Sequence, residues 1–443
     1  MSRLTRKLKD IGAFVNEACR QSFEGPFYNL SMGVYGLGIK IASIRNPKAA
    51  KMTSGHREVW RRLQEGLQPG ARYIWIHAAS LGEFEQGRPL IERIKRECPE
   101  YKVLLTFFSP SGYEIRKNYD KADLICYLPI DTASNARRFV EIVRPEKAVF
   151  VKYEFWRNYL RQLNVHTIPT YLISGIFLPQ QRFFKRGGSW YRAWLRWFDR
   201  LFVQDRRSAE LLASVGIDRV TIAGDTRFDR VADIRNSARR HPLLDRFAGW
   251  KGDSPHTTPV LMAGSSWPAD EDVYTPWVNA HSSVKLVVAP HEFDSERLKV
   301  LKGRFTNGAV LLSEAERNPE LLDKTQVLII DCFGLLSSAY AYADVAYVGG
   351  GFGTGIHNIN EAAAHGIPVM FGPKHDKFLE AEELKTLGGG IAVSSREGFE
   401  TNASRLLFDP AERERRGRWA GEYIAEKTGA TGIIFDTLFP PDK

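Results

Sequence analysis

A strand that runs directly into a polar turn opens the first half of the chain: Ile76-His77-Ala78-Ala79-Ser80-Leu81-Gly82-Glu83. A second such segment stands about 270 residues later and reads Val348-Gly349-Gly350-Gly351-Phe352-Gly353-Thr354-Gly355-Ile356-His357-Asn358-Ile359-Asn360-Glu361. In both, an apolar strand meets a glycine-containing turn and then a helix, whose free backbone N–H groups can hold an anion. Two segments of this kind, with different chemistry, predict two α/β domains in one chain.

Short apolar runs alternate with helical patterns on both sides of these segments. We expect strands in the first half at 73–78, 102–107, 123–128, 147–151, 167–173, 201–204 and 220–223. In the second half we expect them at 260–263, 284–289, 309–312, 327–330, 345–348, 368–371 and 391–393. Strands that alternate with helices form parallel, doubly wound sheets. The predicted fold is therefore α/β and of the GT-B type, with two Rossmann-like domains facing one another across a cleft.

Length and composition divide the chain into four parts. With 443 residues it exceeds one ordinary core, so two domains are expected. Residues 1–45 form a basic and apolar segment, and residues 46–235 form the first domain. Residues 236–258 are polar and contain proline, which indicates a linker. Residues 259–443 form the second domain.

The positive charge is concentrated near the N-terminus. Residues 1–62 hold 12 Lys/Arg and 4 Asp/Glu, while the whole chain carries a net charge of +10. Nucleic-acid-binding proteins usually spread positive charge over a binding face. Here the charge belongs to the N-terminal segment, so a nucleic-acid partner is not expected. The apolar stretch from Pro26 to Ile44 is too polar for a clear spanning helix. Its basic flanks instead predict an interfacial helix on anionic lipid, with packing on the first domain as the alternative.

The basic residues before this stretch are Arg3, Arg6, Lys7 and Lys9. They lie within residues 1–25, which resemble a separate amphipathic extension.

The four cysteines are widely spaced and form no CxxC pair, which favours a reducing cytosolic setting. No HExxH or paired-cysteine motif occurs, so no metal is predicted. The glycine run matches neither a Walker A nor a GxGxxG motif, so ATP and NAD are not supported as cofactors.

Glu83 is the candidate general base. It follows Ser80 by three residues, which is also the spacing of a capping box at a helix start. A partly buried carboxylate at the carboxyl end of a strand can accept a proton from an attacking hydroxyl. His77, Ser80 and Gly82 belong to the same edge and are candidate acceptor-site residues.

Glu154 is a second carboxylate at a strand end, after residues 147–151. Its neighbours Tyr153, Phe155 and Trp156 are aromatic, and an apolar surrounding raises a carboxyl pKa unless a cation compensates. Lys152 is the cation that we expect to do so. The alternative for Glu154 is a structural salt bridge.

The second half offers a candidate nucleotide site. His291 ends a predicted strand, although a lone histidine is more often structural. The five glycines between Gly349 and Gly355 suit a phosphate or sugar cradle, or simply close backbone packing. Asn358 and Glu361 have capping-box spacing, and the Glu361 carboxylate could also accept two hydrogen bonds from ribose hydroxyls.

Six segments together resemble the 3-deoxy-D-manno-octulosonic acid (Kdo) transferases of lipopolysaccharide assembly, from about Pro26 to the C-terminus. They are His77-Ala78-Ala79-Ser80-Leu81-Gly82-Glu83, Tyr153-Glu154-Phe155-Trp156-Arg157-Asn158, Gly224-Asp225-Thr226-Arg227-Phe228-Asp229, Pro290-His291, Asp331-Cys332-Phe333-Gly334 and the glycine turn with His357-Asn358-Ile359-Asn360-Glu361-Ala362-Ala363. The resemblance implies an inverting, metal-independent GT-B enzyme that moves Kdo from CMP-Kdo to a lipid A precursor. It also implies the cytoplasmic face of the inner membrane as the location.

The same resemblance implies roles for single residues. Glu83 would be the catalytic base. The contacts with cytidine monophosphate (CMP) would fall on Pro290, His291, Phe333, Gly334, Leu335, Asn358, Ile359, Asn360 and Glu361. The chain departs from the better-known members at Lys152 and Leu335, where they have acids, and across residues 266–271, where they read Thr-His-x-x-Glu-Glu.

Two other classes of function stay open at this point. One is another GT-B enzyme, such as a nucleotide-sugar 2-epimerase, which would need no lipid anchor. The other is a basic protein that binds anionic lipid or nucleic acid without catalysis, which the near-neutral body of the chain disfavours.

Overall fold

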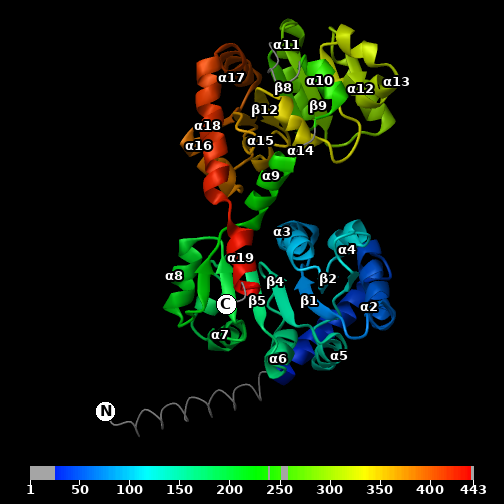
Figure 1. The fold of residues 1–443 in the computed structure, drawn as a ribbon, viewed down its shortest axis with the longest axis vertical. Helices are drawn as coiled ribbons and strands as arrows, with labels where there is room; N and C mark the ends of the chain where they lie inside the picture. The colour runs from blue at the N-terminus through cyan, green and yellow to red at the C-terminus, as the bar shows by residue number, and fades with distance from the viewer. Residues whose placement is uncertain (1–24, 238–239, 251–257, 441–443) are drawn as a thin grey trace. The chain divides into compact units, whose positions relative to one another are not determined.

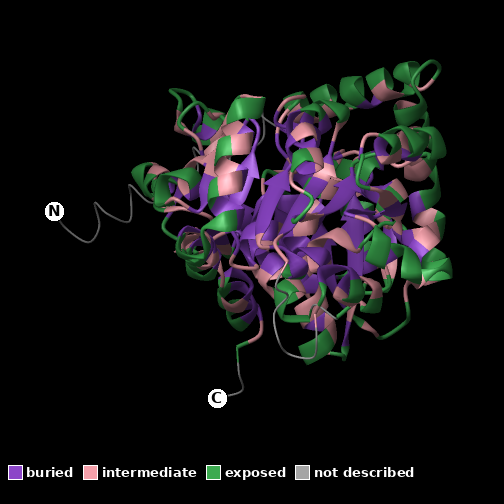
Figure 2. Ribbon diagram, turned by 90° about the horizontal axis from the view of Figure 1, so that it is seen from above, coloured by how far each residue is buried: buried purple, intermediate pink, exposed green. Residues whose placement is uncertain are grey.

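The computed structural model describes residues 25–237, 240–250 and 258–440. They form two compact units, one of residues up to Arg227 together with the stretch from Gly429, the other of Phe228–Thr428. Figure 1 shows the elements of both. Buried residues gather in the strands of each unit, and the helices expose their outer sides (Figure 2).

The first unit is built on a seven-stranded parallel sheet in the order β3-β2-β1-β4-β5-β6-β7. Its strands are β1 Arg72–His77, β2 Tyr101–Phe107, β3 Leu124–Tyr127, β4 Lys147–Val151, β5 Thr170–Gly175, β6 Arg200–Val203 and β7 Val220–Ile222. The strand order reverses between β1 and β4, and ligands of open α/β sheets bind at the carboxyl ends of strands at such a point. Glu83 and Glu154 follow these two strands.

Helices cover both faces of this sheet and bury an apolar cluster on each. They are α2 Pro47–Gly66, α3 Leu81–Glu97, α4 Pro110–Arg116, α5 Ala133–Val143, α6 Arg157–Val165, η1 Arg182–Phe184, α7 Ser189–Leu195, α8 Arg206–Ser214 and α19 Ala430–Leu438. Helix α5 shows why these residues form helices: Thr132 caps its first turn, and its apolar residues bury one side.

The second unit repeats the architecture with the strand order β10-β11-β9-β8-β12-β13-β14, again parallel. Its strands are β8 Val260–Ser266, β9 Lys285–Pro290, β10 Ala309–Leu311, β11 Val327–Ile329, β12 Val345–Val348, β13 Val369–Phe371 and β14 Gly390–Ala392. The reversal lies between β8 and β12, so the turn after Val348 starts at the expected ligand edge. All fourteen predicted strands are present, within three residues at either end.

The helical elements of the second unit pack on both faces of its sheet. They are α9 Thr226–Ser237, α10 Pro242–Ala248, α11 Pro268–Ala280, α12 Ser295–Gly303, α13 Leu312–Arg317, η2 Pro319–Lys324, α14 Leu336–Ala339, η3 Tyr340–Tyr342, α15 Asn360–Ala363, α16 Leu379–Leu387, α17 Arg396–Phe408 and α18 Pro410–Lys427.

The predicted domain boundaries need two corrections. The described part of the expected linker 236–258 is not a linker, because Leu244 and Phe247 of α10 are buried in the core of the second unit. The chain also does not stay in the second unit to its end. Ile434 and Leu438 of α19 are buried in the first unit, where α19 packs on α3 (Figure 1). The composition of residues 236–258 predicted a linker because most of these residues are polar or charged. The few apolar residues among them are nevertheless the ones that pack into the core.

Residues 25–42 form a helix that is fixed to the first unit by side-chain hydrogen bonds. Tyr28 donates to Asp131 at 2.7 Å, and Asn29 Oδ1 accepts from Asn158 Nδ2 at 2.8 Å. The packing alternative of the sequence analysis is thus confirmed for one face of this helix. Burial raises the pKa of Asp131 to about 6, although several donors point at its carboxylate.

The opposite face of this segment is apolar and exposed. Its large side chains recur every three or four residues, and we call them the exposed stripe: Phe27, Leu30, Val34, Leu37, Ile41 and Ile44, all more than half exposed. Among the described residues, no helix is both long enough and apolar enough to cross a bilayer. The predicted extension over residues 1–25, with its four basic residues, lies outside the described residues except for Gly25.

Candidate functional site

Glu83 lies in the first turn of α3, at the carboxyl end of β1. Its Oε2 accepts the backbone N–H of Ser80 at 3.0 Å, so the carboxylate does help to cap the helix. Burial raises the pKa of Glu83, the nearby charge of Glu154 raises it further, and His77 and backbone donors oppose the shift. A raised pKa suits a general base better than the ordinary value of a surface glutamate. Capping and proton acceptance are therefore compatible in this geometry.

Glu154 and His77 form a buried network beside Glu83. The Glu154 side chain lies 3.2 Å from His77 Nε2 and accepts the indole N–H of Trp156 at 2.5 Å. His77 Nδ1 contacts Thr106 Oγ1 on β2 at 2.9 Å. The strands β1, β2 and β4 thus bring together four polar groups that the sequence separates by up to 79 residues.

The predicted compensation of Glu154 by Lys152 is wrong. Among the residues that the structure describes, Lys152 makes no ion pair with Glu154, and its ammonium lies 5.3 Å from the centre of the Tyr153 ring. Lys152 has a φ of 66°, in the left-handed region, which turns the chain sharply after β4. The partners of Glu154 are therefore a histidine and an indole.

Ser80 and Gly82 shape the surface around the base. A side chain at Gly82 would meet open space, with no atom within 4 Å of its Cβ. Gly112 at the start of α4 instead packs so tightly that a Cβ would lie 3.1 Å from the Ser80 backbone carbon. The turn that carries Glu83 is thus packed against α4 at Ser80 and has open space at Gly82.

The glycine turn after β12 is packed more tightly than an open cradle. The N–H groups of Gly349, Gly350, Gly353 and Gly355 all donate within the protein, at 2.8–3.1 Å. A Cβ at Gly351 would lie 2.5 Å from the backbone of Gly372. The close-packing alternative is therefore confirmed, and the prediction that these glycine N–H groups serve as anion donors is wrong for four of the five glycines.

Glu361 is held by side chains from two elements of the second unit. Its Oε2 accepts the hydroxyl of Ser337 on α14 at 2.5 Å, and its Oε1 accepts Asn358 Nδ2 at 3.0 Å. The helix begins at Asn360, later than a cap at Asn358 would place it, and Asn358 Oδ1 accepts the N–H of Asn360 at 3.1 Å. Asn358 is exposed, whereas Ile359 and Asn360 are buried. Side-chain contact with a ligand at this turn would thus fall to Asn358 and Glu361.

Three aromatic rings stack at the carboxyl ends of β8, β9 and β12. His291 stacks on both Trp267 and His357, with centroid distances of 4.5 and 4.4 Å. The indole N–H of Trp267 donates to Nε2 of His357 at 2.9 Å. Burial lowers the pKa of His357, as does the neighbouring His291. Trp267 occupies a position where the better-known relatives have histidine, and its stacking was not predicted.

The remaining predicted donor residues differ in exposure. Phe333 is 89% exposed and contacts Phe293 with a centroid distance of 4.6 Å. Gly334 has a φ of 87°, which only glycine adopts at little cost. Leu335 packs against the core, and Pro290 ends β9. This loop can therefore offer a ring and backbone groups to a ligand.

Two further residues matter to the site and were missed. One is Arg230 on α9. Burial lowers the pKa of its guanidinium, and the charge of Glu361 partly opposes this shift. Asp270 on α11 is fully buried and accepts from Gly350 N at 2.8 Å and from Tyr347 at 2.8 Å, which fixes the glycine turn. Arg230 precedes Glu361 by 131 positions, so no local sequence pattern links the two residues. Asp270 had a signal in its position in the first turn of α11, three residues after the capping residue Trp267.

One group of side chains could hold a cation, as far as the described residues show: His375, Asp376 and Glu382. The Lys385 ammonium lies 2.8 Å from Glu382 and 3.1 Å from His375 Nε2. The ammonium of Lys385 thus already pairs with one of the two carboxylates of this group. It includes none of the predicted site residues.

Comparison with known proteins finds similarity to one group of enzymes. Residues 54–230 match the family model described as 3-deoxy-D-manno-octulosonic-acid transferase (kdotransferase). The chain is similar to Kdo transferases in both comparisons. A Kdo transferase of Aquifex aeolicus is 27% identical over 357 residues, covering 79% of this chain and 91% of the relative. One of Haemophilus influenzae is 25% identical over 384 residues, covering 84% and 88%. The protein is thus a glycosyltransferase, and the non-enzymatic alternative is wrong.

Solved structures confirm the fold. A UDP-N-acetylglucosamine 2-epimerase of Neisseria meningitidis has a TM-score of 0.54 and 14% identity, and covers 83% of this chain and 99% of its own. The MurG protein of Acinetobacter baumannii has a TM-score of 0.52 and 11% identity, with 83% and 99% covered. At such identity the likeness shows the GT-B fold alone, so it does not favour the epimerase alternative over Kdo transfer.

Proposed function

We propose that this protein is a Kdo transferase that moves Kdo from CMP-Kdo to the glucosamine disaccharide of a lipid A precursor, with inversion and with Glu83 as general base. The observation that carries the proposal is the position of the Glu83 carboxylate at the carboxyl end of β1, beside the buried Glu154–His77 network. Burial and the charge of Glu154 raise the pKa of Glu83 there. A carboxylate in that state, beside an open turn, can take a proton from a sugar hydroxyl.

The proposed step is a single displacement. The acceptor hydroxyl attacks the anomeric carbon of Kdo, a new C–O bond forms, and the bond from that carbon to the CMP oxygen breaks. The hydroxyl proton goes to Glu83, and the electron pair of the broken bond goes to the CMP phosphate. Attack opposite the leaving group inverts the anomeric centre.

The proposed CMP site lies in the second unit. Glu361 suits the ribose hydroxyls, because its carboxylate is fixed by Ser337 and Asn358. The stack of Trp267, His291 and His357 offers planar surfaces and imidazole N–H groups. Arg230, beside Glu361, can attract the leaving phosphate, a role that the packed glycine turn fills poorly. A leaving group with one phosphate needs no metal in this proposal.

The proposed location is the cytoplasmic face of the inner membrane. The helix that carries most of the exposed stripe contains Lys40 and is followed by Arg45, Lys48 and Lys51. Apolar side chains flanked by cations bind anionic lipid surfaces through burial and charge together. This placement would bring a membrane-embedded acceptor to the first unit.

A mass assay tests the proposal. The full chain is mixed with CMP-Kdo and an acylated lipid A precursor, with and without a chelator. We expect a product heavier by whole Kdo units, CMP release and no chelator effect. Absence of Kdo on the product would contradict the proposed donor and acceptor, and loss of activity in chelator would contradict the metal-free step.

A further inference from the structure

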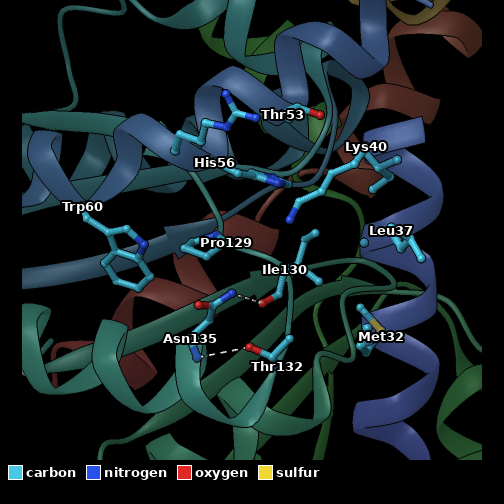
Figure 3. A pocket seen from close by; sticks show the side chains of 14 residues that line it. Met32, Leu37, Lys40, Thr53, His56, Trp60, Pro129, Ile130, Thr132 and Asn135 are labelled. Carbon is cyan, nitrogen blue, oxygen red and sulfur yellow. Dashed lines mark hydrogen bonds between the residues drawn. The ribbon is translucent and has the colours of Figure 1, made fainter. Parts of the chain in front are cut away.

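A cavity of about 400 Å³ lies in the first unit, between the helix of residues 25–42, α2 and the segment after β3 (Figure 3). Its lining is mainly apolar and also includes polar side chains: Met32, Gly33, Gly36, Leu37, Ile39, Lys40, Thr53, His56, Arg57, Trp60, Pro129, Ile130, Thr132 and Asn135. Gly33 leaves open space, while a Cβ at Gly36 would lie 3.0 Å from the Ile130 side chain.

The charge of this cavity is positive. Its lining holds Lys40 and Arg57 and no carboxylate. Within the described ranges, neither cation takes part in an ion pair, and Figure 3 shows the Lys40 side chain reaching toward Ile130 and His56. Burial lowers the pKa of His56 to about 4, so at neutral pH this ring adds no charge. The cavity thus combines an apolar wall with two cations.

The cavity lies between the exposed stripe and the side-chain network of Glu154. Leu37 belongs both to its lining and to the exposed stripe. On the other side, His56 contacts Phe108 with a centroid distance of 5.8 Å, and Phe108 contacts Trp156 at 4.7 Å. Trp156 donates to Glu154, the charge that raises the pKa of Glu83. Two aromatic rings therefore separate the cavity from the carboxylate pair.

We propose that this cavity holds one acyl chain of the acceptor glycolipid, with a phosphate of the same molecule at Lys40 and Arg57. The inference rests on the proposed function and adds a subsite to it. An acyl chain gains by leaving water, and paired cations attract a phosphate dianion. Free phosphate has no apolar part for the lining. A glycolipid has both parts and also carries the hydroxyl that must reach Glu83.

Two glycines of one helix provide a matched test. Gly33 lines the cavity, and its added Cβ would meet no atom within 4 Å, so Gly33→Leu fills space without a clash at its root. Gly38 also has open space but does not line the cavity, so Gly38→Leu is the control. Both changes replace a helical glycine and should not weaken the helix.

The readout is KM for two acceptors, the acylated glucosamine disaccharide phosphate and the same molecule after deacylation. We expect Gly33→Leu to raise KM for the acylated acceptor about tenfold, which is about 1.4 kcal/mol, and to leave KM for the deacylated one unchanged. Gly38→Leu should change neither. Equal behaviour of the two variants, or an equal loss with both acceptors, would overturn the acyl subsite.

The charge is tested separately with Lys40→Gln and Arg57→Gln, against Lys48→Gln outside the cavity. We expect the first two to raise KM for phosphorylated acceptors but not for a dephosphorylated one, and the third to do neither. A uniform loss in all three variants would show a general effect of surface charge and contradict the phosphate contact.

A direct readout without turnover uses a glycolipid with a photoreactive group near the end of one acyl chain. We expect labelling of Met32, Leu37 and Ile130, weakened by Gly33→Leu. Labelling confined to Phe27, Leu30 and Val34 would assign the lipid contact to the exposed stripe and overturn the cavity as subsite. Failure of the proposed function would instead show in the wild-type protein, as a lack of Kdo transfer to either acceptor.

Discussion

The indole N–H of Trp267 donates to Nε2 of His357 over 2.9 Å, while His291 stacks on both rings. Because Nε2 accepts, the neutral ring carries its proton on Nδ1, which leaves that N–H for a ligand. Burial and His291 lower the pKa of His357, so the ring stays neutral at pH 7. A neutral donor with a fixed tautomer is thus built into the proposed CMP site.

Trp267→Phe keeps a stacking ring and removes the hydrogen bond. We expect CMP affinity to fall about fivefold, since one such bond contributes about 1 kcal/mol. Nitrogen NMR of the histidines should show the Nδ1–H tautomer of His357 in the wild type and a mixture in the variant. Trp277→Phe, which loses a bond to Ser404 elsewhere in the unit, is the control. Unchanged CMP affinity and an unchanged His357 signal would refute this role of Trp267.

Glu154→Gln should move the pH dependence of activity. Glu83 acts when deprotonated, and its raised pKa places the acid limb of kcat/KM above pH 4.5. The substituted amide can still accept from Trp156 but carries no charge, so the pKa of Glu83 falls and the acid limb shifts to lower pH. Glu114→Gln, outside this network, should leave the limb in place. If the acid limb of kcat/KM in Glu154→Gln stayed in place or moved to higher pH, the electrostatic coupling of Glu83 and Glu154 would be contradicted.

Glu361→Ala should weaken CMP binding by calorimetry. Hydrogen bonds to a charged group contribute about 1.5–3 kcal/mol, which corresponds to a loss of roughly tenfold to a hundredfold. Ser337→Ala should give a smaller loss, because it frees one carboxylate oxygen without removing it. The exposed Glu320 supplies a control in Glu320→Ala. Wild-type affinity in a folded Glu361→Ala protein would remove this residue from the donor site.

Val34→Glu combined with Ile41→Glu should reduce flotation with anionic vesicles. Both side chains are more than 60% exposed, so the fold should tolerate the change while the membrane contact loses apolar area and gains repulsion. Val300→Glu, equally exposed in the second unit, is the control. CMP binding should persist in all three proteins. Equal flotation of the stripe variant and the wild type would show that this helix is not the membrane contact.

The strands and the position of Glu83 were predictable because their signals are local. Apolar runs of four to eight residues mark parallel strands, and the polar residue after each strand falls at the ligand edge by topology alone. The order and spacing of the six segments then indicated the family. The capping contact of Glu83 with Ser80 followed from their three-residue spacing.

One partner of Glu154 was not predictable, because it depends on strand order. His77 meets Glu154 only when β1 lies beside β4, whereas Trp156 is two residues away in the chain. Lys152 was the wrong choice, since its side chain lies over the ring of Tyr153. The return of α19 to the first unit is of the same kind. An apolar helix shows that it will be buried but not against which sheet.

The glycine turn shows a different limit. Five glycines indicate close approach of the backbone, but sequence does not say whether a ligand or the protein itself approaches. Here Asp270, Gly355 and Gly372 fill that space. Arg230 was missed because its relation to Glu361 exists only after α9 packs into the second unit.

The proposal depends most on Glu83 as the base, and one substitution tests it directly. Glu83→Gln keeps the size of the side chain and its contact with Ser80, so fold and CMP affinity should match the wild type. Turnover with CMP-Kdo and the acylated acceptor should fall on the order of 10²–10⁴-fold, the usual effect of losing a general base. Turnover near the wild-type rate in the folded variant would contradict the account and leave Glu83 as a helix cap.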